Sequence, residues 1–138
     1  METITLPDDV MAFCMRATSF PEGIQQAHRE LHGVVPFDMH RSYYGISRPE
    51  GGPIVYRAGA TELYESELSP YKLETFLIKK GQYLCIDVPG YMLHLDRIGS
   101  AFKELLADGR IDSNGACIEW YIDEQLCKCI VRMEEHGR

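Results

Sequence analysis

Two stretches of the chain repeat apolar residues at helical spacing. In the first, Ile24, Ala27 and Leu31 recur three or four positions apart, which places their side chains on one face of a helix. Ser19 is followed three residues later by Glu22, the spacing of a capping box at a helix start. We therefore expect a first helix from about residue 19 to residue 34.

The second helical stretch covers about residues 91–107. Charged residues lie off its apolar stripe, as expected for a helix with one buried face, and Gly109 provides a stop signal just beyond it. The stripe consists of Leu95, Ile98, Phe102, Leu105 and Leu106.

The remaining apolar runs alternate with polar residues or carry β-branched and aromatic side chains, which is typical of strands. Turn-rich segments separate them, including Arg48–Gly52 and Lys79–Gly81. The expected strands cover residues 10–18, 39–47, 53–59, 73–78, 82–88, 116–122 and 126–133, and residues 2–6 form a further short strand.

The order strand, helix, strand, strand occurs twice, which predicts pseudo-repeats at about residues 1–60 and 71–134. An acidic, polar linker at residues 61–70 joins them. The fold class is therefore α+β, with duplicated units in a single domain covering residues 1–138. Such units form a curved antiparallel sheet with two helices on one face, and the opposite face is free to form a central cleft.

Composition and charge narrow the possible functions. The chain has 138 residues, of which 45% are hydrophobic and 25% charged, as in one globular domain. A net charge of −7 argues against direct binding of nucleic acid or of an anionic membrane, both of which require basic residues. It is compatible with a small cationic ligand. The odd count of five cysteines indicates reduced thiols and a cytoplasmic protein.

Glu119 is the chemically distinctive residue of the expected strand 116–122. Since side chains alternate along a strand, Cys117, Glu119 and Tyr121 share one face, whereas Ile118 and Trp120 share the other. We expect the more apolar face, with Trp120, to lie under the helices. Glu119 then faces either solvent or a cleft, and periodicity alone favours solvent.

Three segments of the chain carry a resemblance to a known family. They are Gly45–Pro49, the run from Leu73 to Ile78 followed by Lys80–Tyr83, and Ala116–Tyr121. Together with the element order, they resemble the GyrI-like domains, which include the effector-binding modules of AraC-type and MerR-type multidrug regulators. The similarity extends over about residues 10–133.

The resemblance implies two pseudo-symmetric units around a cleft, in which a glutamate on the penultimate strand faces aromatic rings and accepts lipophilic cations. Glu119 matches that position. Tyr121, Tyr44 and Tyr56 are the expected ring contacts, with Trp120 as a ring or, more simply, as a core residue. Tyr43, beside Tyr44, is then expected under a helix.

Three functions stay open at this point. The first is a binding module for a lipophilic, cationic compound, with a role in transcriptional regulation or drug sequestration. The second is a hydrolase of the type that some standalone relatives resemble, acting on cyclopropane-containing compounds through Glu119 and a tyrosine such as Tyr121. The third is a protein-binding inhibitor, with a partner protein or a homodimer.

Neither a metal nor a cofactor is predicted. Cys127 and Cys129 share one strand face, but a structural zinc site needs four ligands, and no second pair of cysteines or histidines lies near them in the sequence.

Overall fold

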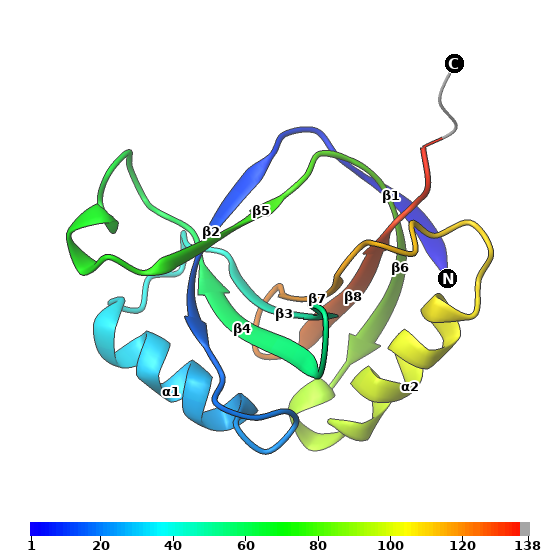
Figure 1. The fold of residues 1–138 in the computed structure, drawn as a ribbon, viewed down its shortest axis with the longest axis horizontal. Helices are drawn as coiled ribbons and strands as arrows, with labels where there is room; N and C mark the ends of the chain where they lie inside the picture. The colour runs from blue at the N-terminus through cyan, green and yellow to red at the C-terminus, as the bar shows by residue number, and fades with distance from the viewer. Residues whose placement is uncertain (136–138) are drawn as a thin grey trace. The chain divides into compact units, whose positions relative to one another are not determined.

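The computed structural model describes residues 1–135, which form eight strands, two α-helices and two short 3-10 turns (Figure 1). They belong to two compact units. Unit 1 combines Met1–Asp8 with the chain from Lys79 onward, and unit 2 is Asp9–Ile78. All strand pairs within each unit are antiparallel, so the predicted α+β class is confirmed.

Unit 2 is a four-stranded sheet with one helix, α1, packed against β2 and β4 (Figure 1). The strand order is β3-β4-β2-β5. The elements are β2 (Val10–Arg16), α1 (Ile24–Val34), β3 (Tyr43–Pro49), β4 (Ile54–Ala60), the 3-10 turn η1 (Ser69–Tyr71) and β5 (Glu74–Ile78).

The apolar face of α1 is buried as the helical spacing predicts. Ala27 and Leu31 are almost fully buried against Ala58 and Ala60 of β4. The predicted capping box is wrong, because α1 begins at Ile24 and has no side-chain cap. Residues 19–23 instead form a turn, closed by a hydrogen bond from the Gly23 N–H to the carbonyl of Ser19.

Unit 1 has the same plan, with helix α2 packed against β6 and β8. The strand order is β1-β6-β8-β7. The elements are β1 (Glu2–Leu6), β6 (Gly81–Pro89), the 3-10 turn η2 (Tyr91–Leu93), α2 (Asp96–Leu106), β7 (Cys117–Tyr121) and β8 (Leu126–Arg132).

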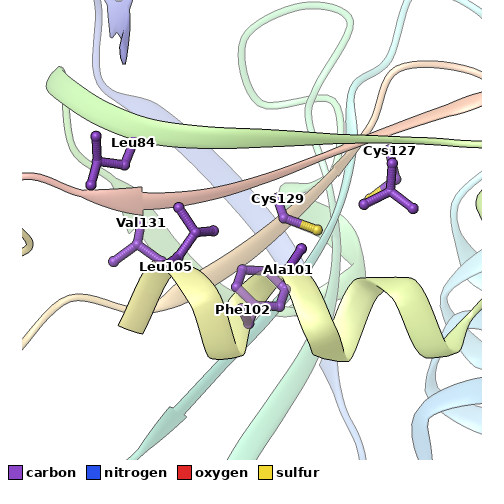
Figure 2. Close-up of a cluster of buried hydrophobic side chains, with 8 residues drawn as sticks. Leu84, Ala101, Phe102, Leu105, Cys127, Cys129 and Val131 are labelled. Carbon is purple, nitrogen blue, oxygen red and sulfur yellow. The ribbon is translucent and has the colours of Figure 1, made fainter. Parts of the chain in front are cut away.

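The core of unit 1 lies between α2 and the sheet. Figure 2 shows Phe102 and Leu105 of the helix directed at Cys129 and Val131 of β8. The helix is shorter than predicted because the chain first makes the separate turn η2. Gly90 precedes that turn with a positive φ of 65°, a conformation that glycine adopts without steric cost.

The outermost strand of each unit comes from the other half of the sequence. β1 precedes β2 in the chain but pairs with β6, and β5 precedes β6 but pairs with β2. From the sequence order we expect each of these strands to belong to the repeat that follows it. Apart from this exchange, β2-α1-β3-β4 and β6-α2-β7-β8 repeat the same element order, as predicted.

The linker after β4 is fastened to unit 2 rather than extended. Leu68 is fully buried in the α1 core. The buried Arg41 donates to the carboxylate of Glu67 at 2.7 and 2.5 Å and to the carbonyl oxygens of Pro36 and Thr61. One guanidinium therefore holds the linker against the loop that follows α1.

Within the part of the chain that the structure describes, no helix has the length and apolar character needed to cross a membrane.

Candidate functional site

Glu119 and Tyr121 form the chemical centre of unit 1. The Tyr121 hydroxyl donates a 2.5 Å hydrogen bond to Oε1 of Glu119, two residues earlier on β7. The Tyr121 ring stacks on that of Tyr91 in η2, with centroids 5.6 Å apart and an interplanar angle of 27°. The Tyr91 hydroxyl in turn donates to the carbonyl of Asp123. A half-buried carboxylate thus lies beside an anchored pair of aromatic rings.

The face assigned to Glu119 from the sequence is wrong. Cys117 and Tyr121 pack against the α2 core, so the Glu119 face of β7 is the helix face of the sheet. The pairing with β8 explains this result. Glu119 lies opposite Cys129 and Tyr121 opposite Cys127, and both cysteines are buried under α2. Periodicity alone ranks the cysteine face as the less apolar one, although its cysteines pack in the α2 core.

Trp120 lies on the opposite face of β7, where its cross-strand neighbour is Lys128. It is half-buried. Within unit 1 it therefore does not share a surface with Glu119 and Tyr121, because neighbouring residues on a strand point to opposite faces. Its role as a ligand contact stays a prediction.

The thiols around Glu119 are protonated and unreactive. Burial, together with the negative charge of Glu119, raises the pKa of Cys117 to about 11. A hydrogen bond with Cys127 and burial also hold the pKa of Cys129 above the ordinary thiol value. The thiolate is the reactive form of cysteine, and these thiols are protonated. The side chains beside the carboxylate are therefore neutral and polarisable.

Tyr56 is fully buried on the α1 face of unit 2. Its hydroxyl lies 2.8 Å from Nε2 of His28 on α1, and its ring stacks on Phe20 with centroids 6.0 Å apart. Burial, and secondarily the charge of His32, lowers the pKa of His28 to about 4. The imidazole is therefore neutral at pH 7.

Tyr44 and Tyr56 lie on opposite faces of the unit 2 sheet. Tyr44 on β3 pairs with Gly59 on β4, so these two residues share a face of the sheet. Tyr56 lies an odd number of residues before Gly59 on the same strand, so its side chain is on the other face. Tyr43 packs against the α1 core, so the prediction that it lies under a helix is confirmed. Tyr44 is buried on the other face, where desolvation raises its pKa.

The structure therefore brings together Glu119 and Tyr121 from the predicted set, and it separates Tyr44 from Tyr56. That the two unit 2 tyrosines contact a ligand stays a prediction. Sequence reasoning missed two residues next to the predicted ones, Tyr91 and His28. A signal existed for His28, because it continues the helical spacing of Ile24, Ala27 and Leu31.

A second cluster of polar side chains lies on β1 and β6. A carboxylate oxygen of Glu2, the thiol of Cys85 and a carboxylate oxygen of Asp87 lie within 4.8 Å of one another, close enough to bind one metal ion. The ammonium group of Lys128, however, lies 2.9 Å from Asp87 and 3.7 Å from Glu2. The lysine supplies the positive charge that a metal would bring, so the cluster is explained as an ion-pair network.

No family model and no curated protein matches the sequence. Solved structures do match the fold. One is an integron cassette protein from the mobile metagenome of Vibrio cholerae, VCH_CASS2, with a TM-score of 0.71 and 11% identity over 96% of this chain and 95% of the other. Another is SAV2435 bound to tetraphenylphosphonium, with a TM-score of 0.66 and 11% identity over 96% and 93% of the two chains.

Proposed function

We propose that this protein is a receptor for a small lipophilic cation, with Glu119 as the charged contact. The observation that carries the proposal is the half-buried carboxylate of Glu119 beside the stacked rings of Tyr121 and Tyr91. Support comes from the fold neighbour that binds tetraphenylphosphonium and from the resemblance of residues 116–121 to the GyrI-like effector-binding domains.

The charge of the ligand follows from the cost of placing a carboxylate among apolar groups. A desolvated carboxylate is unfavourable unless a positive charge or hydrogen bonds compensate it. The Tyr121 hydroxyl donates one such hydrogen bond to Glu119. A bound cation is attracted to the carboxylate and an anion is repelled, so binding of a cation is favoured over that of a neutral or anionic molecule of equal size.

The lipophilic character follows from the groups around the carboxylate. Tyr121 and Tyr91 present aromatic faces, and Cys117 and Cys129 are neutral thiols. A cation over an aromatic face gains roughly 0.5–2 kcal/mol from cation–π attraction. A delocalised or shielded cation is weakly hydrated, so it loses little hydration free energy when it leaves water. Such a cation is therefore expected to bind in this environment better than an ammonium ion.

The test is a calorimetric titration with tetraphenylphosphonium and, in parallel, with tetraphenylborate, an anion of nearly the same shape. We expect the phosphonium to bind and the borate to bind at least tenfold more weakly. Glu119→Gln should weaken phosphonium binding at least tenfold, which corresponds to about 1.4 kcal/mol, and should reduce the discrimination between the two ions.

The matched control is Glu104→Gln, which removes an exposed carboxylate from α2 in the same unit and should leave both titrations unchanged. Tyr121→Phe keeps the ring and removes the hydroxyl, so it should alter affinity less than Glu119→Gln does. Equal binding of phosphonium by wild type and Glu119→Gln would overturn the charge role.

The carboxylate–phenol pair also favours a second candidate, acid–base hydrolysis of a strained small substrate. In that reaction Glu119 would activate a water molecule and Tyr121 would donate a proton to the leaving group. The hydroxyl proton of Tyr121 is directed at Glu119, however, and binding needs no further group. We therefore favour the receptor. Product formation from cyclopropane-containing compounds that is lost in Glu119→Gln would favour the enzyme instead.

A further inference from the structure

Two loops of unit 2 expose four large apolar side chains. Phe37 and Met39, in the loop after α1, are 74% and 82% exposed. Leu63 and Tyr64, in the linker after β4, are 40% and 67% exposed. We call these four residues the loop surface. Large apolar side chains exposed on neighbouring loops are candidates for an interaction site, and aromatic and methionine side chains are enriched at protein interfaces.

Hydrogen bonds join the two loops to each other, so the loop surface has a defined structure and does not consist of two independent segments. Ser42 and Thr61 exchange two hydrogen bonds, of 2.9 and 3.1 Å. Arg41 donates to the carbonyl of Thr61 and to Glu67, and Glu67 accepts a bond from the Leu63 N–H. Binding to such a surface requires little ordering, which would otherwise reduce affinity.

Phe37 is held in place although it is exposed. Its ring stacks on that of Tyr43, with centroids 5.7 Å apart and planes nearly parallel at 1°. The Tyr43 hydroxyl accepts a hydrogen bond from the backbone N–H of Asp38. The Phe37 ring therefore has the character of an interface anchor, since aromatic side chains are enriched among the energetically dominant contacts of interfaces.

The charge around the loop surface is acidic. The same two loops, residues 36–43 and 61–68, contain the carboxylates of Asp38, Glu62, Glu65 and Glu67. Their one guanidinium, that of Arg41, is buried and paired with Glu67. The net negative charge of these two loops favours a basic partner, because charge complementarity directs association and suppresses wrong partners. A second copy of this chain would bring the same carboxylates and a net charge of −7.

We propose that the loop surface binds a partner protein through a segment that combines basic and apolar side chains. Apolar residues of that segment cover Phe37, Met39 and Tyr64, and its lysines or arginines face Glu65 and the neighbouring carboxylates. This interaction is separate from the ligand proposed for Glu119, and it uses residues of the other unit.

The test uses fluorescent peptides as probes in a polarisation assay with the full chain. One peptide alternates lysine and leucine, a second alternates lysine and serine, and a third alternates glutamate and leucine. We expect the lysine–leucine peptide to bind most tightly, and its binding to weaken with added salt. The double variant Phe37→Ala/Tyr64→Ala should weaken this binding at least tenfold.

Two further variants keep the test decisive. Met39→Ser/Glu65→Lys changes two exposed side chains and should weaken binding even if the first pair of changes impairs folding. Leu93→Ala removes an apolar side chain that is 87% exposed in unit 1 and should leave binding unchanged. Phosphonium binding should survive in both unit 2 variants.

Several results would overturn the proposal. The double variant could bind the lysine–leucine peptide as well as wild type does, or the lysine–serine or glutamate–leucine peptide could bind equally well. A wild-type dimer in sedimentation that becomes monomeric in Phe37→Ala/Tyr64→Ala would show that a second copy, rather than a basic partner, covers the surface.

Discussion

His28 shows how burial changes the chemistry of one side chain. It lies on α1 with its ring nitrogen 2.8 Å from the Tyr56 hydroxyl, and burial lowers its pKa to about 4, with a smaller contribution from His32. The folded protein therefore favours the neutral imidazole. Protonation at mildly acidic pH would place a charge in a site that cannot solvate it.

The stability of the protein should consequently depend on the protonation of His28. The folded-state pKa of about 4 lies below the ordinary value of 6.5, so the unfolded chain binds more protons between these values. Stability is highest above pH 6.5 and falls as the pH drops towards 4. Relative to His28→Gln, wild type should lose up to about 3 kcal/mol over this range, measured by urea unfolding at several pH values.

The exposed His40 provides the control. His40→Gln should follow the wild-type pH profile. If the profiles of wild type and His28→Gln run parallel between pH 7 and pH 4, the imidazole is not held neutral by the fold.

Glu119 shows what could and could not be predicted at the scale of single residues. Its position in a strand, and its two-residue spacing from Tyr121, follow from the sequence, and the structure joins the two side chains in a hydrogen bond. Its orientation was predicted wrongly, because the face that turns toward α2 is decided by the pairing with Cys127 and Cys129 on β8. That pairing is a property of the sheet and not of the strand.

At the scale of elements, an ion-pair network connects the turn before β4 with β5. The buried guanidinium of Arg57 donates two hydrogen bonds to Glu50, at 2.6 and 3.0 Å, and one to Glu74, at 2.8 Å. Arg16 of β2 also pairs with Glu74. Arg57 is buried while its partners are partly exposed, so the network both neutralises an interior charge and fixes the turn.

Removing one carboxylate from the network should destabilise the protein. Glu50→Gln leaves the buried Arg57 without one of its two charged partners, and we expect the free energy of unfolding to fall by about 1–3 kcal/mol, measured by urea denaturation. Hydrogen bonds from Arg57 and Arg48 lower the pKa of Glu50 to about 2. The advantage of wild type is therefore present above the ordinary pKa of 4.5 and is lost as the pH falls towards 2.

Glu30→Gln, an exposed change on α1, should alter stability by less than about 0.5 kcal/mol. An equal effect of Glu30→Gln and Glu50→Gln would mean that the network adds nothing to stability.

The elements themselves were largely predictable because their apolar periodicity is strong. Leu31 and Phe102 lie in helices and are buried as their spacing predicts. The helix starts were not predictable. Gly23 closes a turn through the Ser19 carbonyl, and Gly90 introduces the separate turn η2. These boundaries depend on backbone hydrogen bonds and dihedral angles that periodicity does not reveal.

At the scale of the whole molecule, the two units share one plan, but the outermost strand of each unit is not the strand that precedes its repeat in the sequence. β1 pairs with β6 in full register, from Glu2 opposite Cys85 to Leu6 opposite Gly81. This pairing joins residues that are far apart in the chain, and no local pattern predicts it. The sequence order alone favoured attaching β1 to the repeat that follows it.

The pairing of β1 with β6 can be tested by deleting residues 1–8. Since β1 pairs with β6, backbone amides of β6 should exchange with solvent faster in the truncated protein, as measured by hydrogen exchange with mass spectrometry. Amides of β2 should change less, although β2 directly follows the deleted segment in the chain. Faster exchange confined to residues 10–16 would contradict the observed pairing.

The pairing of β1 with β6 also affects how the protein is made. Among the described elements β1 leaves the ribosome first, but β6, which pairs with it, is synthesised only after all of unit 2. Throughout that interval the nascent chain carries β1 without its partner strand, and an unpaired strand can be bound by other chains or chaperones. Unit 2 contains all four of its own strands and can close while synthesis continues, whereas unit 1 must wait for the last strand of the described chain.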